Sequence, residues 1–194
     1  MNYLAHLFLA QPTAESLIGN LAGDFVKGAL GDRFPPAIAE GIRHHRRVDA
    51  FTDAHPSVAA FRRVLIPEHG HYARVISDMF FDHFLAVDFE RWAGQSLPSF
   101  LSRTYALIDP YIDELPGRLR FVYPRMRDGA WLQSYATVDG IHVALRNLSF
   151  RLSRRPHLET ATRHLVDSRP ELQRRFEAFF PDVVAISSPS QRKR

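Results

Sequence analysis

The sequence predicts an all-α fold, a single-domain helical bundle, and three observations support this prediction. Apolar residues recur at spacings of three and four over most of the chain. Proline and glycine cluster between these helix-like segments, and neither a long apolar–polar alternation nor an Asn-Gly turn indicates a hairpin. The length of 194 residues suits one domain, and no internal repeat or linker divides the chain.

Start and stop signals place the expected helices in chain order. Thr13 can cap a helix that reaches about residue 29, and Pro35 and Pro36 suit the first turn of a helix ending near Thr52. Further helices are expected over residues 55–65, 72–92, 97–115, 119–154 with breaks, and 157–180. Residues 1–184 would form the domain, and residues 185–194 are expected to be a disordered basic tail.

The charge balance argues against nucleic acid as a partner. Lys and Arg total 25 and Asp and Glu total 21, a net charge of +4. Arg192, Lys193 and Arg194 supply three of these positive charges, so the rest of the chain carries only 22 − 21 = +1. A nucleic-acid-binding domain would carry a basic face within its fold. The absence of cysteine excludes disulfides, thiol catalysis and cysteine-ligated zinc, and it is compatible with the cytoplasm.

No segment is expected to enter a membrane. The apolar run over residues 3–10 is interrupted by His6 and follows no Lys or Arg, unlike a secretory signal. The most apolar later stretch, residues 75–92, carries six ionisable residues. A membrane span would not tolerate so many charges.

Polar residues fall at helical spacing inside two apolar stripes. Ile38, Ile42, His45 and Asp49 step by four, three and four, so an apolar stripe leads directly into a His–Asp pair. Asn20, Asp24 and Lys27 share another stripe by the same arithmetic.

The long helix over residues 72–92 repeats this pattern. Asp78 and Asp82 lie one turn apart between apolar neighbours, and His83 lies about 100° further around the helix. Burying either carboxylate is costly unless it is paired with a cation or coordinates a metal. Pairing of each with an arginine is the alternative explanation.

The density of histidine and aspartate favours a metal site. Seven of the ten histidines lie in the first 83 residues, and the same segment contains Asp24, Asp49, Asp53, Asp78 and Asp82. Histidine and aspartate without cysteine can bind Mn²⁺, Fe, Mg²⁺ or Zn²⁺, and helical bundles commonly build such sites from several helices. No functional role is expected for the histidines that should be exposed on a helix or in a loop: His44, His69, His71, His142, His157 and His164. No P-loop, Gly-x-Gly-x-x-Gly, Gly-x-Ser-x-Gly or His-Glu-x-x-His motif is present.

Several long motifs in order give the chain a resemblance to a known family. These are MNYLAH at residues 1–6, GNLAGDFVKG at 19–28, GIRHHRRVDAFTDAHP at 41–56 and DMFFDHFL at 78–85. They resemble the acyl carrier protein phosphodiesterase family, over nearly the whole chain up to the tail and including Trp131, Tyr135 and the pair at 140–141.

The resemblance implies a fold similar to that of the metal-dependent HD-type phosphohydrolases. It also implies hydrolysis of the 4′-phosphopantetheine arm from the serine of holo-acyl carrier protein, with Mn²⁺ as the usual metal and Mg²⁺ as an alternative. The chain departs from the standard HD order, because the adjacent pair is reversed to Asp82-His83 and Asp24 precedes it. The wider superfamily therefore does not assign the metal ligands.

The pattern and the resemblance together nominate residues for each role. The expected metal ligands or their immediate neighbours are Asp24, His45, Asp49, Asp78, Asp82 and His83. General acid–base or supporting roles are expected for His6, Asp53 and His55, and substrate binding for Asn20, Lys27, Arg46 and Arg47. An exposed, ion-paired helix face is the alternative for Arg46 and Arg47.

The expected protein partner is acidic, because carrier proteins are small and acidic. Arginine-rich surfaces would steer such a partner, and candidate contacts are Arg62, Arg63, Arg151, Arg154 and Arg155. Two other functions remain open at this point. One is an HD-like phosphohydrolase acting on nucleotides or small phosphodiesters, and the other is a metal-free helical protein that binds acidic partners.

Overall fold

The computed structural model describes residues 1–152 and 156–188 and confirms the all-α prediction, with no strand among these residues. The α-helices are α1 (Tyr3–Leu9), α2 (Ala14–Ala22), α3 (Pro36–Ala54), α4 (Pro56–His69), α5 (Ala73–Val87), α6 (Phe89–Ala93), α7 (Leu97–Ile108), α8 (Leu119–Asp128), α9 (Trp131–Ser134), α10 (Val138–Ser149), α11 (His164–Asp167) and α12 (Arg169–Ser187). Four 3₁₀ segments join them: η1 (Gly23–Phe25), η2 (Gly70–Tyr72), η3 (Asp109–Glu114) and η4 (Leu158–Arg163).

Several helices start where the sequence signals placed them. The Thr13 side chain caps α2 by accepting a hydrogen bond from the Ser16 N–H at 3.3 Å. Pro36 is the first residue of α3, where its missing N–H costs nothing. The His55 side chain caps α4 by accepting from the Ser57 N–H at 3.1 Å.

Other boundaries differ from the prediction. The expected helix over residues 13–29 ends at Ala22 and continues only as η1, after which Val26 is extended and glycines at positions 28 and 31 have positive φ. The final helix extends through Ser187, three residues into the predicted tail, while residues 189–194 of that tail lie outside the described residues.

The short first helix, α1, was not predicted, and its start is held by tertiary contacts. The Asp82 carboxylate on α5 accepts hydrogen bonds from the N–H groups of Leu4 at 2.8 Å and Ala5 at 3.1 Å. These N–H groups belong to the first turn of α1 and have no partner within the helix. A seven-residue helix is marginal alone, so this remote cap fixes α1 against α5.

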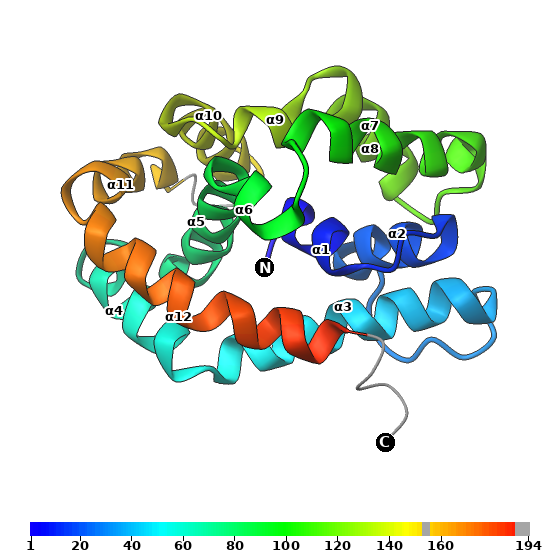
Figure 1. The fold of residues 1–194 in the computed structure, drawn as a ribbon, viewed down its shortest axis with the longest axis horizontal. Helices are drawn as coiled ribbons and strands as arrows, with labels where there is room; N and C mark the ends of the chain where they lie inside the picture. Colours follow the sequence, from blue (N-terminus) through cyan, green and yellow to red (C-terminus); the bar gives the residue numbers. More distant parts are fainter. Residues whose placement is uncertain (153–155, 189–194) are drawn as a thin grey trace.

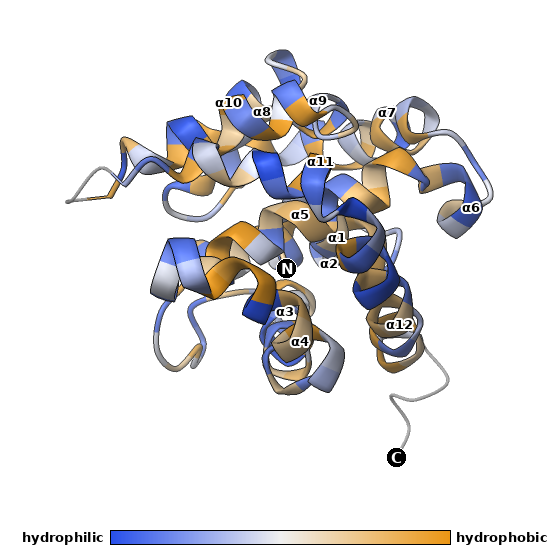
Figure 2. Cartoon of the chain, turned by 90° about the vertical axis from the view of Figure 1, so that its left-hand side faces the viewer, coloured by the Kyte–Doolittle hydropathy of each residue, from blue (hydrophilic) through white to orange (hydrophobic). Residues whose placement is uncertain are grey.

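Helix α5 supplies much of the core. Phe80 and Phe81 are fully buried, and Phe81 stacks 6.0 Å from Phe176 of α12. Helix α12 also contacts α3 and α4, and Figure 1 shows it running beside both. Figure 2 shows hydrophobic and hydrophilic residues mixed along most helices, as expected for amphipathic helices that bury one face.

The α2 and α3 backbones approach each other closely at two glycines. A Cβ added at Gly41 would lie 2.9 Å from the Gly19 Cα and from the Ser16 carbonyl oxygen. This close contact fixes how α2 and α3 pack, and thereby where the polar side chains of α3 lie relative to α2. Among the described residues, no helix is long and apolar enough to cross a membrane.

Candidate metal centre

Helices α1 and α3 and the segment η1 bring four predicted residues together. His6 on α1 places Nε2 3.2 Å from Asp49 Oδ1, and His45 on α3 places Nε2 3.2 Å from Asp49 Oδ2. Asp24 in η1 approaches the same nitrogen of His45, with Oδ1 3.6 Å from Nε2. The two imidazole rings stack, with centroids 3.7 Å apart and planes at 19°. Asp49 is therefore the carboxylate shared by both histidines.

A hydrogen bond at Nδ1 fixes the orientation of the His45 ring. Its Nδ1 lies 2.8 Å from the backbone carbonyl oxygen of Asn20 and donates to it, which directs Nε2 towards Asp24 and Asp49. A hydrogen bond from the ring nitrogen that faces away from a metal selects one tautomer of a ligating histidine. The Asn20 side chain is fully buried, donates to the Ser16 carbonyl at 2.9 Å and contacts His44 Nδ1 at 2.9 Å.

This position bears on two sequence-based expectations. The Asn20 amide packs α2 against α3, and its role in substrate binding stays a prediction. His44 was expected to be exposed, but it is only 3% exposed because it bonds to that amide. The helical arithmetic placed His44 away from the His45 stripe without predicting that α2 covers it.

The cluster balances its charges internally. Burial would lower the pKa of His45, but Asp24 and Asp49 raise it to about 9. Burial and the neighbouring His45 lower the pKa of His6 to about 4. Burial opposes ionisation of Asp49, yet contacts with His45 and His6 keep its pKa well below the usual range. The structure thus holds ionised carboxylates, protonated His45 and neutral His6 at pH 7.

The amino group of Met1 extends the cluster to Asp78. Its nitrogen is 3.2 Å from Asp49 Oδ1 and 3.2 Å from Asp78 Oδ1. Burial lowers the pKa of this amine, but Asp78 and Asp49 more than compensate and raise it to about 10. Arg62 Nη2 also approaches Asp78 Oδ1 at 3.5 Å. Helical periodicity could not reveal the Met1 contact, because a backbone amine carries no side-chain pattern.

The structure places Asp82 and His83 elsewhere than in this cluster. Asp82 is completely buried and caps α1, so both its oxygens already accept backbone hydrogen bonds. His83 is turned towards α9, where its Nδ1 lies 2.8 Å from the carbonyl oxygen of Tyr135. In this structure both side chains position helices, and their role as metal ligands stays a prediction from the sequence.

Asp53 and His55, the other predicted acid–base residues, also have structural partners. Asp53 forms ion pairs with Arg62, at 3.0 Å, and with Arg74. His55 caps α4 and places Nε2 3.2 Å from Asp182 Oδ2 on α12. Both lie beyond Asp49 along α3, and neither contacts His6 or His45 through a described interaction.

The predicted phosphate-binding cations differ in how they are held. Arg46 is half-buried and donates to the Val26 carbonyl at 3.0 Å, close to Asp24 in sequence. Lys27 is exposed beside the same segment. Arg47 is exposed and pairs with Glu40 at 2.8 Å, which matches the alternative of an ion-paired helix face. Arg154 and Arg155, two of the proposed partner contacts, lie outside the described residues.

The side chains present fit a divalent metal ion. His6, His45 and Asp49 each offer one ligand atom, and these atoms lie within 4.8 Å of one another. Nδ1 of the buried His6 has no hydrogen-bond partner among the described residues, and its Nε2 approaches Asp49 without good hydrogen-bond geometry. Two imidazoles and a carboxylate, with Asp24 alongside, are donors that divalent cations accept. A bound cation would also supply the positive charge that protonated His45 supplies now.

Comparison with known proteins identifies relatives that match along nearly the whole chain. The family model described as acyl carrier protein phosphodiesterase matches residues 1–183. The protein of that name from Serratia proteamaculans is 34% identical, covering 98% of this chain and 100% of the relative. Those from Yersinia enterocolitica and Photorhabdus laumondii are 32% and 31% identical, covering 98% and 95% of this chain and 100% and 93% of the relatives. No solved structure matches significantly. A match of this extent shows that the chain belongs to the acyl carrier protein phosphodiesterase family.

Proposed function

We propose that this chain is a metal-dependent phosphodiesterase that removes the 4′-phosphopantetheine arm from the serine of holo-acyl carrier protein. The products would be apo-acyl carrier protein and free 4′-phosphopantetheine. The family match over residues 1–183 supports the reaction. The observation that carries the mechanism is the group of buried His6 and His45 around the half-buried carboxylate of Asp49.

We propose Mn²⁺ as the ion, with Mg²⁺ as the alternative, held by His6, His45, Asp49 and Asp24. Carboxylate oxygens favour hard cations such as Mn²⁺, and imidazole is an acceptable ligand beside them. This assignment makes His6 a ligand rather than a general acid or base, because its ring stacks on His45 and faces the same carboxylate. When bound, the ion supplies Lewis acidity towards the phosphoryl oxygens and a lowered pKa for the attacking water.

The protein's own groups would orient the substrate around this centre. Asn20 holds His45 in one tautomer through its backbone carbonyl, and Asp82 holds α1 so that His6 reaches Asp49. Arg46 and Lys27 remain the proposed phosphate contacts, since both adjoin the segment that carries Asp24. The Met1 amine, itself held by Asp78, contacts the Asp49 oxygen that faces His6 and helps to fix the position of this carboxylate.

For the carrier protein itself, we propose exposed arginines as contacts. Arg63 and Arg151 are exposed, whereas Arg62 is engaged with Asp53 and Asp78 and is removed from this set. Neither nucleic acid nor a membrane is proposed as a partner, and the cytoplasm remains the expected location.

The deciding experiment incubates purified protein with holo-acyl carrier protein, with Mn²⁺ or with a chelator, and follows the intact mass of the carrier. The expected result is loss of the arm with Mn²⁺ and no loss with the chelator. A parallel panel of nucleotides and small phosphodiesters tests the alternative phosphohydrolase. Turnover of the panel without turnover of the carrier would overturn the proposed substrate.

A further inference from the structure

A second group of potential metal ligands lies where α4 ends, at a separate place in the fold. Glu68 and His69 are the last two residues of α4, and His164 is the first residue of α11. One ligand atom from each lies within 4.8 Å of the other two. His164 Nε2 is 3.7 Å from Glu68 Oε2, and the two imidazole rings meet edge to face with centroids 5.5 Å apart.

The two histidines in this group have available nitrogen atoms. Nε2 of His69 and Nε2 of His164 are both buried and have no hydrogen-bond partner among the described residues. His164 is only 8% exposed, which differs from its predicted place on a helix surface. A buried nitrogen without a partner is unfavourable, and a bound ion would satisfy it.

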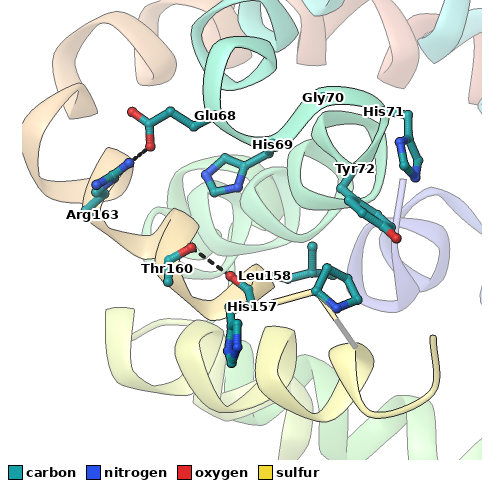
Figure 3. A pocket seen from close by; sticks show the side chains of 10 residues that line it. Glu68, His69, Gly70, His71, Tyr72, His157, Leu158, Thr160 and Arg163 are labelled. Carbon is teal, nitrogen blue, oxygen red and sulfur yellow. Dashed lines mark hydrogen bonds and ion pairs between the residues drawn. The ribbon is translucent and has the colours of Figure 1, made fainter. Parts of the chain in front are cut away.

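Two residues of the group, Glu68 and His69, line an open cavity. Figure 3 shows both side chains with other residues of its lining, and Arg163 lies beside Glu68. The cavity has a volume of about 670 Å³, and α4, η2 and η4 contribute to its wall. His71 and His157 line the same cavity but do not belong to the group of three. An ion can therefore approach Glu68 and His69 from solvent, whereas His164 is not among the residues that line the cavity.

We propose that Glu68, His69 and His164 form a second metal site, which binds Zn²⁺. Two imidazoles and one carboxylate form a donor set that zinc uses in proteins, with a further position left for solvent or ligand. This set is richer in nitrogen, relative to carboxylate, than the first centre with its two aspartates, so it favours a borderline ion over Mn²⁺ or Mg²⁺. The proposal is independent of the phosphodiesterase function.

Arg163 competes with the metal for Glu68. Its guanidinium forms an ion pair with the Glu68 carboxylate, as the dashed line in Figure 3 marks. The side chains of Arg163 and Glu68 are 56% and 39% exposed, so this pair is solvated and weak. Zinc binding would exchange the guanidinium for the cation at the same oxygen. Removing the guanidinium should therefore tighten zinc binding.

Occupation of this site would cross-link distant parts of the chain. Residues 68 and 69 lie at the end of α4, and residue 164 follows η4, which packs on α10. An ion that binds only the folded chain stabilises it by mass action, so the melting temperature should rise with zinc concentration.

The test uses the full chain carrying Asp49→Asn, which removes the shared carboxylate of the first centre. Co²⁺, which reports its ligands by visible absorption, and Zn²⁺ are titrated into this chain and into the same chain with His69→Gln. His69 is half-buried, so its replacement disturbs packing less than replacement of His164. The matched control is His71→Gln, an exposed histidine of the same cavity. Circular dichroism verifies that each chain is folded.

We expect the chain to bind one ion. His69→Gln should lower the affinity for this ion by at least about tenfold, as loss of a ligand should, whereas His71→Gln should leave the affinity unchanged. Arg163→Gln should strengthen binding, and His69→Gln in an otherwise wild-type chain should leave carrier hydrolysis unchanged. Equal affinity in the His69→Gln and His71→Gln chains, or no zinc-dependent rise in melting temperature, would overturn the proposal. Loss of hydrolysis in the chain with Asp49→Asn would concern only the first centre. Failure of the proposed function can therefore be distinguished from failure of the zinc proposal.

Discussion

Asp49 is the residue on which the first centre depends, since it contacts His6, His45 and the Met1 amine. Asp49→Asn keeps the shape but removes the negative charge, so two imidazoles lose their shared carboxylate. We expect hydrolysis of holo-acyl carrier protein to fall by at least about 100-fold, since even outer-shell changes cost 10–100-fold. The measurement is the initial rate at saturating Mn²⁺.

Asp53→Asn is the matched control on the same helix, one turn later. Asp53 is paired with Arg62 and Arg74, so its loss should lower stability slightly and leave most of the rate. If both variants lost activity equally, Asp53 would belong to the centre as the sequence suggested. If neither did, Asp49 would not be a metal ligand.

Asp82 makes stability depend on pH. Its burial raises its pKa from 3.8 to about 7, more than the Leu4 and Ala5 N–H groups lower it. Between these values the unfolded chain releases the proton while the folded chain retains it. The Asp82 contribution to stability is therefore full below about pH 4 and is lost as the pH rises towards 7.

Urea denaturation of the metal-free chain across this interval measures that contribution. Compared with Asp82→Asn, the wild type should lose up to about 1.4 kcal/mol of unfolding free energy for each pH unit. A difference between the two chains that stays constant with pH would contradict the assigned titration of Asp82.

At the scale of elements, the centre depends on how closely η1 approaches α3. A Cβ added at Gly23 would overlap the His45 ring and lie 2.6 Å from its Nδ1. We expect Gly23→Ala to displace this imidazole from the Asn20 carbonyl and to weaken Mn²⁺ binding by at least about tenfold. Calorimetric titration with Mn²⁺ measures the change.

Gly41→Ala is the comparison for this prediction, because it overpacks the crossing of α2 and α3 rather than the imidazole. It should destabilise the fold by about 1–3 kcal/mol, the usual cost of overpacking. Its Mn²⁺ affinity well below the melting temperature should fall less than that of Gly23→Ala. The reverse order would show that the glycine at η1 does not control His45.

At the scale of the whole molecule, recognition of an acidic carrier should depend on salt. Excluding the last three residues, the chain has a net charge of only +1, so attraction must come from local groups such as Arg63 and Arg151. Screening lengths shrink from about 10 Å at 0.1 M salt to about 3 Å at 1 M. We expect KM for holo-acyl carrier protein to rise across this range.

A small phosphodiester substrate is the control for this measurement. It touches the centre but not the surrounding surface, so its KM should change much less with salt. Equal salt dependence of the two substrates would place the effect at the metal centre instead of at a docking surface.

Local physics made much of this protein predictable from its sequence. Helix starts at Thr13 and Pro36 follow from capping and proline geometry, and the spacing of His45 and Asp49 places both on one face of α3. The motifs around these residues also sufficed to indicate the family. These features depend on neighbours within a few residues, which the sequence displays directly.

Only the tertiary structure distinguishes the role of Asp49 from that of Asp82. Both are aspartates on apolar helical stripes, and periodicity gives them the same description. Asp82 meets the first turn of α1 and becomes its cap, whereas Asp49 meets His6, His45 and the Met1 amine. Likewise, His164 joins Glu68 and His69 although about a hundred residues separate them. Spacing determines which side chains share a helix face, but packing between distant segments determines what each of them contacts.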